Sequence, residues 1–210
     1  MHHPITLPTL LLLLAAAPVA AGPFPSHRDS GVLPEAIVGW ATRVHDYSPT
    51  AEVVAIDQFG GVPHNEPTHA LGGPDRATVS LGDLDATAIA GGAAPGEITV
   101  GFNGHLYDGP GNDLAIFENA ALFFDDHSPD FIFAELAFVE VSSDGVHFAR
   151  FSTTSLNVEP DSATPDPDLE QLYAPYGRDF AGVNTTNLDG FAGVHPALIG
   201  TPFDLAALSN

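Results

Sequence analysis

The sequence predicts an all-β protein with long loops. Beyond residue 21, no window shows the sustained apolar period of 3.6 residues that an amphipathic helix produces. Short runs rich in Val, Ile and Phe are instead bounded by Gly, Pro, Asn or Asp, a pattern that is typical of strands. The chain also contains 21 Gly and 19 Pro residues, which favour frequent turns.

The first 21 residues indicate a secretory signal peptide. Leu10 to Ala17 is an unbroken Leu/Ala run, too short to span a bilayer. Val19 and Ala21 place small residues at positions −3 and −1 of a cleavage site, so we expect cleavage after Ala21 and a mature chain that begins at Gly22. The alternative is a membrane anchor or a buried helix. No later apolar segment is long enough to span a membrane, and we expect a secreted, extracellular or cell-surface protein.

One domain is expected after the signal peptide. Residues 22–36 are rich in Pro and Gly and predict a flexible leader, and residues 37–210 predict a single β domain without repeats or linkers. The residues that we expect to lie in its core are Trp40, Val100, Phe102, Ile116, Phe138, Val139, Val141 and Phe148. The expected strands cover residues 37–46, 77–81, 96–102, 113–118, 132–142 and 146–151, and residues 203–208 predict one helical turn.

Three regions of the chain carry additional expectations. Segment 132–142 has apolar residues on both faces, which indicates a central strand covered on both sides. Asp144-Gly145 predicts a tight hairpin turn, because this dipeptide suits right-twisted strands. Residues 157–190 begin with an acidic, Pro-rich stretch that has few apolar side chains, and they predict a long solvated loop.

Charge and cysteine content exclude several classes of function. The formal net charge is −22, and the five basic residues are all Arg. This balance argues against a nucleic-acid partner and against an anionic membrane surface. The chain has no Cys, which removes disulfides, thiolate metal sites and cysteine nucleophiles. An acidic protein repels acidic polysaccharides, so a neutral glycan or a basic partner fits better.

Several phrases occur together and in order along the chain. They are ALGGPD (70–75), VSLG (79–82), ITVGF (98–102), DGPGNDLAIFENA (108–120), FAELAFVEVSSDGVHF (133–148) and GTPFDLAAL (200–208). Over roughly residues 38–208 the chain resembles secreted bacterial cell-surface proteins of the PEP-CTERM-associated type. The phrase VSSDGVHF also resembles a hairpin of discoidin-type, galactose-binding-like jelly rolls. The resemblance implies a jelly-roll-like antiparallel β-sandwich and a surface role, and it brings no catalytic activity. The sequence ends without the sorting tail of that family, which puts anchoring through that tail in doubt.

The loop at residues 108–118 is the strongest candidate for a metal site. Asp108, Asn112 and Asp113 lie within six residues on a Gly-rich loop, and Glu118 follows five residues later. Hard oxygen ligands on such a loop suit Ca²⁺, which takes six to eight oxygens. Asp75 is a candidate additional ligand from a second loop. The alternative is an Asp/Gly turn between strands, with Asp113 capping the bend and Asp75 in a plain turn.

Other ionisable residues carry weaker expectations. Glu118 and Glu140 lie inside apolar strands, and we expect them to face solvent unless Glu118 is a ligand at the end of the loop. His64 and His69 flank Glu66, a combination that could hold Zn²⁺ or Cu²⁺, but their spacing matches no metal-binding motif and we expect a solvated loop. His147 alternates with apolar neighbours and is expected to face water.

No catalytic motif is evident in the sequence. Nucleophile-elbow, phosphate-loop and zinc-protease motifs are absent. The leading hypothesis is therefore a non-enzymatic, Ca²⁺-stabilised extracellular binding or structural module whose partner is a glycan or a cell-surface protein. The alternative is an extracellular hydrolase or lyase that acts on polysaccharide through an acid pair such as Asp125–Asp126 or Asp108–Asp113. Transition-metal capture by His residues is a third and weaker hypothesis.

Overall fold

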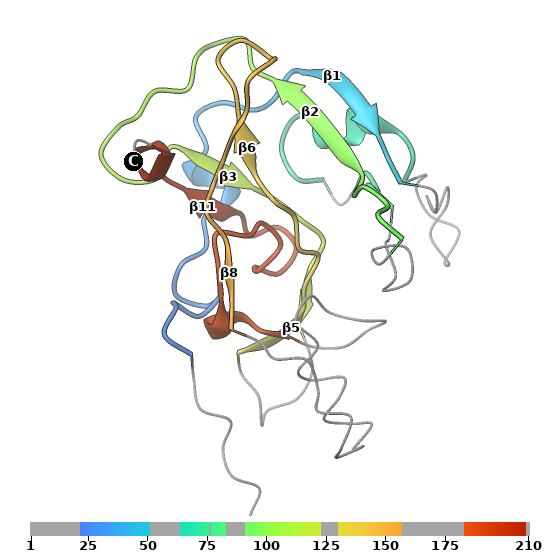
Figure 1. The fold of residues 1–210 in the computed structure, drawn as a ribbon. Coiled ribbons are helices and arrows are strands. Elements are labelled where there is room, and N and C mark those ends of the chain that lie inside the picture. The colour runs from blue at the N-terminus through green and yellow to red at the C-terminus, as the bar shows by residue number, and fades with distance from the viewer. Residues whose placement is uncertain are drawn as a thin grey trace, which may run out of the picture.

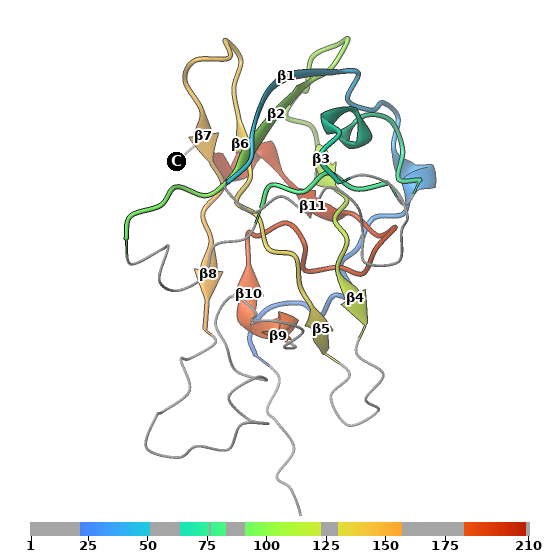
Figure 2. The ribbon, with the colours of Figure 1, turned by 90° about the vertical axis from the view of Figure 1, so that its right-hand side faces the viewer.

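The protein is all-β, as the sequence predicts. The computed structural model describes residues 22–50, 64–75, 77–82, 91–122, 130–156 and 183–208. Within these ranges, eleven short strands form five small antiparallel sheets, and the only helices are four short 3-10 helices (Figures 1 and 2). The jelly-roll arrangement stays a prediction, because five separate small sheets do not define that topology. No helix of the described residues has the length and apolar character to cross a membrane.

The strands are short and fall into pairs or triplets. They are β1 (Arg43–Ser48), β2 (Glu97–Gly101), β3 (Leu114–Ile116), β4 (Ala121–Leu122), β5 (Phe131–Phe133), β6 (Glu140–Val141), β7 (Ala149–Arg150), β8 (Thr154–Ser155), β9 (Val183–Asn184), β10 (Leu188–Asp189) and β11 (Thr201–Phe203). The 3-10 helices are η1 (Pro34–Ala36), η2 (Pro67–Ala70), η3 (Thr185–Asn187) and η4 (Leu205–Leu208). The sheets are β1–β2, β3–β11, β4–β5–β9, β6–β7 and β8–β10.

The sequence locates several of these elements. Strands β2 and β3 lie inside the predicted segments, and η4 forms the helical turn expected at residues 203–208. Strand β1 starts six residues after the predicted segment 37–46 begins and pairs with β2 through a register irregularity between Val44 and Asp46. The prediction of a strand at residues 77–81 is wrong, because this segment forms no strand. It is instead held beside β1 by single hydrogen bonds, such as Tyr47 Oη to Ser80 O at 2.7 Å.

The single central strand predicted at residues 132–142 is also wrong. The segment changes partner along its length: β5 pairs with β4 and β9, Ala137 bridges to Ala192, and β6 pairs with β7. A close backbone approach interrupts its middle. Gly193 has a φ of +80°, and a Cβ there would overlap the carbonyl oxygen of Glu135. The turn that contains Gly193 therefore lies against the segment where a continuous ladder would run.

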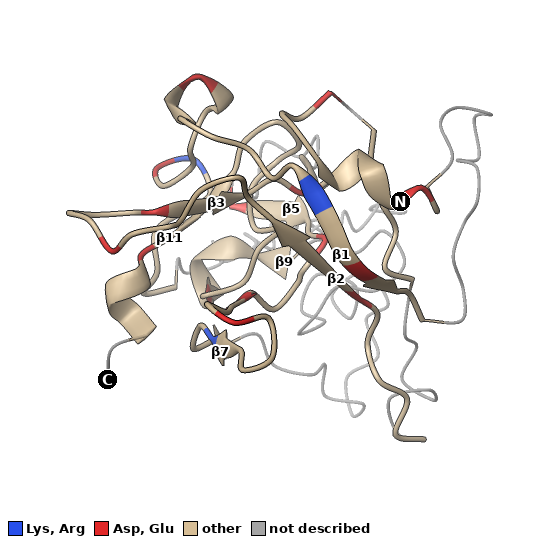
Figure 3. Ribbon diagram, turned by 90° about the horizontal axis from the view of Figure 1, so that it is seen from above, with Lys and Arg blue, Asp and Glu red and all other residues tan. Residues whose placement is uncertain are grey.

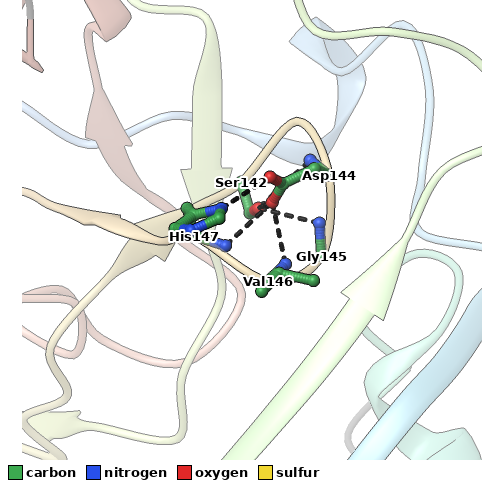
Figure 4. Close-up of polar contacts among 5 residues, drawn as sticks. All are labelled: Ser142, Asp144, Gly145, Val146 and His147. Atoms are coloured by element: carbon green, nitrogen blue, oxygen red, sulfur yellow. Dashed lines mark hydrogen bonds and ion pairs between the residues drawn. The ribbon is translucent and has the colours of Figure 1, made fainter.

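The predicted hairpin exists, but its loop is longer than a two-residue turn. The ladder between β6 and β7 ends at the pair Val141–Ala149, and residues 142–148 form the connection. Strand 146–151 is correspondingly shortened to β7. The Asp144 carboxylate accepts the backbone N–H groups of Val146 and His147, both at 2.8 Å (Figure 4). These side-chain bonds satisfy N–H groups that the ladder would otherwise pair.

The core consists of two clusters. One joins Ala120, Ile132, Ala134, Val183, Leu188 and Phe191, and the other joins Val139, Phe151, Ala192 and Phe203. Of the residues predicted for the core, Val139 is buried, whereas the prediction is wrong for Phe138 and Phe148, which are 48% and 43% exposed. Phe138 lies between the Phe191 ring and the Arg150 guanidinium, so it packs without being enclosed. The other five predicted core residues are half-buried: Trp40, Val100, Phe102, Ile116 and Val141.

The prediction of a solvated loop is wrong for residues 183–190. This stretch forms β9, η3 and β10, and Val183, Asn184, Thr185, Thr186 and Leu188 are buried. Its apolar content is low because its buried residues include Asn and Thr, whose polar groups are hydrogen-bonded within the fold. Residues 157–182, the remainder of the predicted loop, lie outside the described residues.

Residues 22–32, which we call the N-terminal segment and which the sequence predicts as part of a leader, are hydrogen-bonded to residues 183–208, the C-terminal segment. Phe24 N donates to Thr186 O at 3.0 Å, and the backbones of Val32 and Gly200 exchange two bonds at 2.9 and 2.8 Å. The first described residues thus lie against residues that are more than 150 positions away in the sequence.

Candidate functional site

Three carboxylates come together beside the loop that the sequence singles out. Asp108, Asp113 and Asp204 each offer an oxygen, and these atoms all lie within 4.8 Å of one another. Asp108 is exposed, and the other two residues are half-buried. Asp204 follows β11, and the pair Phe203–Leu114 in the β3–β11 sheet sets it beside Asp113. The sheet register therefore creates the cluster.

Asp113 connects this loop to the C-terminal segment. Its Oδ1 accepts the Gly109 N–H at 2.8 Å, and its Oδ2 accepts the Leu205 N–H at 3.0 Å. Its own N–H donates to Phe203 O at 2.9 Å. The capping role that the sequence offers as an alternative for Asp113 is thus present in the structure. An ionised carboxylate has about four acceptor sites, so these bonds leave room for a cation.

The predicted ligands are only partly brought together. Asp108 and Asp113 meet, whereas neither Asp75 nor Glu118 belongs to the cluster. Asp75 Oδ1 accepts the Ala77 N–H at 3.0 Å, the bond of a plain turn. Asn112 lies exposed in the same loop as Asp108. Sequence reasoning missed Asp204, and the available signal was its position within residues 203–208, the segment predicted as a helical turn.

Acidic positions are spread over many elements of the described chain. In Figure 3 the Asp and Glu positions occur on several loops and strand ends, while Lys and Arg positions are few. The Asp108–Asp113–Asp204 cluster therefore lies in a broadly negative protein, with a formal charge of −22 for the whole chain. The electrostatic field of such a negatively charged protein raises the local concentration of cations.

Glu118 lies two residues after β3 and is half-buried. Burial, together with the neighbouring Glu135 carboxylate, raises the pKa of Glu118 to about 8. A carboxyl group with this pKa is mainly protonated at neutral pH and can then donate a hydrogen bond. The prediction that Glu118 faces solvent is wrong, because the residue is half-buried. Glu140, by contrast, is exposed as predicted and pairs with Arg150 at 2.7 Å.

Two buried histidines, His27 and His195, lie where the N-terminal segment contacts the C-terminal segment. His195 is 2% exposed, with Nε2 3.1 Å from Ser30 Oγ and Nδ1 2.9 Å from Thr201 Oγ1. Ser30 Oγ donates to Ser26 O at 3.1 Å, so it accepts from the His195 Nε2–H. The hydrogen bond then runs opposite to that of a nucleophile and its base, in which the hydroxyl donates to the imidazole.

His27 completes this buried polar region. Its side chain is 4% exposed, and Nδ1 lies 3.1 Å from Thr185 Oγ1, which itself donates to Asp130 O. Nε2 of His27 is the buried side-chain nitrogen that has no hydrogen-bond partner among the described residues. Burial lowers the pKa of His27, and burial beside His27 lowers the pKa of His195 to about 4. Both rings are therefore neutral at neutral pH.

Of the other histidines, His147 is exposed as predicted, whereas His64 and His69 are not solvated. His147 faces water as expected, with 86% of its side chain exposed. His64 and His69 are half-buried rather than solvated, because both contact Thr78: His64 Nδ1 lies 2.6 Å from its hydroxyl, and His69 Nδ1 lies 3.3 Å from its carbonyl oxygen. The two rings thus hold residue 78 against the 64–70 segment.

The candidate sites in the described part of the chain are the Asp108–Asp113–Asp204 cluster, the neighbouring Glu118 and Glu135, and the buried His27 and His195. Comparisons of the sequence and structure with protein-family models, curated proteins and solved structures gave no match. The interpretation of these sites therefore depends on their geometry and chemistry.

Proposed function

We propose that the protein is a secreted, non-enzymatic extracellular module that binds a glycan or a cell-surface protein or serves a structural role, and that Ca²⁺ stabilises it at Asp108, Asp113 and Asp204. The observation that carries the proposal is the gathering of these three carboxylates within 4.8 Å. An all-oxygen ligand set on a Gly-rich loop matches the ligands of Ca²⁺. Asn112, on the same loop, is a further oxygen donor in this proposal.

Two further properties support the proposal. The Leu/Ala run and the small residues before Gly22 fit export to a compartment in which Ca²⁺ is available. A net charge of −22 disfavours the compact state through self-repulsion, and a bound divalent cation would relieve part of it. The resemblance to PEP-CTERM-associated surface proteins agrees with a surface role, and the negative field favours a neutral or basic partner.

The test is the thermal stability of the secreted protein in Ca²⁺, with Na⁺ at matched ionic strength and Mg²⁺ as controls. At 100 times Kd a bound ion adds about 2.7 kcal/mol, which corresponds to several degrees in Tm. Mg²⁺ should do less, because it requires a tighter octahedron and dehydrates reluctantly.

Asp108→Asn is the sharpest variant, because Asp108 is exposed and its loss leaves the two Asp113 bonds to the backbone intact. It should abolish the Ca²⁺-specific increase in Tm, while the exposed Asp189→Asn should retain it. Asp113→Ala should also abolish the Ca²⁺-specific increase in Tm, but it removes the two hydrogen bonds from the Gly109 and Leu205 N–H groups as well. An equal response of wild type and Asp108→Asn to Ca²⁺ would show that the cluster is not the ion site.

A hydrolase or lyase acting on polysaccharide is the second candidate. The observation that favours it is Glu118, protonated at neutral pH beside Glu135, since glycosidases need one acid of raised pKa. Of the acid pairs named from the sequence, Asp125–Asp126 lies outside the described residues, and Asp108–Asp113 belongs to the cluster. Release of reducing ends from a polysaccharide panel, lost in Glu118→Gln, would favour this candidate over the first.

A further inference from the structure

The first described residue occupies a defined hydrogen-bonded position. Gly22 N donates to Thr186 Oγ1 at 2.6 Å, and two residues later Phe24 N donates to Thr186 O at 3.0 Å. Thr186 is 4% exposed and lies in η3. One buried residue therefore holds the start of the mature chain through both its hydroxyl and its carbonyl.

The Thr186 hydroxyl is oriented to accept. Its hydrogen goes to Oδ1 of Asn184 at 2.7 Å, and the same Oδ1 accepts the Thr186 backbone N–H at 3.0 Å. Asn184 is 2% exposed, so this arrangement is enclosed within the fold. A hydroxyl whose hydrogen is already donated presents only lone pairs to Gly22. A positively charged donor makes the stronger hydrogen bond to such an oxygen.

Position 22 requires glycine in this arrangement. A Cβ there would overlap Thr186 O and Asn187 Oδ1. Thr186 O is a backbone atom, so no rotamer change can move it away. Three oxygens, the two just named and Thr186 Oγ1, thus surround the residue that signal cleavage would expose.

We propose that cleavage after Ala21 creates an α-ammonium group at Gly22 that docks on Thr186 Oγ1, making the mature N-terminus a built part of the fold. The proposal rests on the proposed secretion. A signal peptidase hydrolyses the Ala21–Gly22 bond with one water: the hydroxyl goes to the Ala21 carbonyl carbon and the hydrogen to Gly22 N, which then takes a proton from solvent. The ammonium has three N–H donors where the peptide has one, and its charge suits a protein of net charge −22.

The composition makes this group chemically unique. The chain contains no Lys, because its five basic residues are Arg28, Arg43, Arg76, Arg150 and Arg178. In a chain cleaved after Ala21, the α-amino group of Gly22 is therefore the sole primary amine. An amine-reactive succinimidyl ester then reports on this one position, with no background from side chains.

The experiment expresses the full chain in a secreting host, identifies the N-terminus of the secreted protein by sequencing and intact mass, and measures its acetylation rate near neutral pH. The free peptide Gly-Pro-Phe-Pro-Ser supplies the unprotected rate. The folded protein should react at least about tenfold more slowly, because hydrogen bonds to charged groups contribute about 1.4 kcal/mol or more, which is a factor of ten. Thr186→Val should recover most of the peptide rate, while Thr154→Val, at an exposed strand position, should stay protected.

A second variant covers the case in which Thr186→Val fails to fold. One extra Gly inserted before Gly22 keeps the glycine but displaces the amine by about 3.5 Å, so labelling should become fast. A secreted protein that begins at Gly22 yet reacts at the peptide rate would overturn the docking and leave secretion standing. A product that retains Met1 would overturn both, and a mature N-terminus at any other residue would overturn the docking alone.

Discussion

The hydroxyl oxygen of Ser30 lies 3.1 Å from Nε2 of His195, although 165 residues separate them in the chain. This contact joins the N-terminal segment to the C-terminal segment, where the Thr201 hydroxyl donates a hydrogen bond to Nδ1 of the same ring. The ring is neutral and enclosed, so its protonation state is coupled to the folding equilibrium.

Acid should destabilise the fold through His195. In the unfolded chain its pKa is near the ordinary 6.5, and in the fold burial beside His27 lowers the pKa to about 4. Between these values the unfolded state binds more protons, so the stabilising contribution is complete above pH 6.5 and is lost as pH falls towards 4. At about 1.4 kcal/mol per pKa unit this amounts to roughly 3 kcal/mol. Urea unfolding at a series of pH values measures it.

The comparison variants for this prediction are His195→Gln and His105→Gln. The first removes the buried ring and should flatten this part of the pH profile, although its stability at neutral pH also falls. The second changes an exposed ring and should leave the profile unchanged. An acid dependence that survives intact in His195→Gln would contradict the assignment.

Alkaline pH should destabilise the fold through Glu118. Its pKa is raised from 4.5 to about 8 by burial and by Glu135, so between these values the folded state binds more protons. The contribution is therefore complete below pH 4.5 and is lost as pH rises towards 8, by a few kcal/mol at about 1.4 kcal/mol per unit. Glu118→Gln should raise Tm at pH 8 relative to wild type.

Glu97→Gln, a substitution at the exposed first residue of β2, is the matched control. It should leave Tm at pH 8 near the wild-type value. Because the Glu118 and His195 effects oppose each other between pH 4.5 and 6.5, each is measured as a difference between variant and wild type. A lower Tm for Glu118→Gln at pH 8 would mean that the ionised form is the one the fold requires.

The Asp144 loop should open locally when its carboxylate is removed. The hydrogen bond to the His147 ring, together with the bonds that Oδ1 of Asp144 accepts from the N–H groups of His147 and Val146, holds the pKa of Asp144 well below the usual range (Figure 4). In Asp144→Ala the two amides should exchange hydrogen several-fold faster by NMR, because their acceptor is gone. Ser143→Ala, in the same loop, should leave both rates unchanged.

Phe151 and Phe138 should differ clearly in their contribution to stability. Phe151 is 4% exposed and packs on Phe203 with ring centroids 4.9 Å apart, so Phe151→Ala should cost about 3–5 kcal/mol. Phe138 is 48% exposed, and Phe138→Ala should cost about 1–2 kcal/mol. Chemical denaturation measures both, and equal costs would contradict this difference in burial.

Local patterns in the sequence determined the all-β class and the positions of β2, β3 and η4. Apolar runs bounded by turn residues act over a few positions, and these elements depend on little else. The sequence also indicated Asp108 and Asp113 as neighbours, because a Gly-rich loop of six residues keeps them close wherever it lies. The capping of the 142–148 loop by Asp144 follows equally from residues within three positions of it.

Only the tertiary structure decided which distant groups meet. The register of β11 against β3 brought Asp204 to Asp113, while Asp75 remained in its own turn. The burial of Glu118 beside Glu135 and of His195 beside His27 likewise depends on packing between segments far apart in the chain. A single sequence carries periodicity and turn signals, whereas sheet register and desolvation are properties of the assembled fold, and they set both the carboxylate cluster and the shifted pKa values.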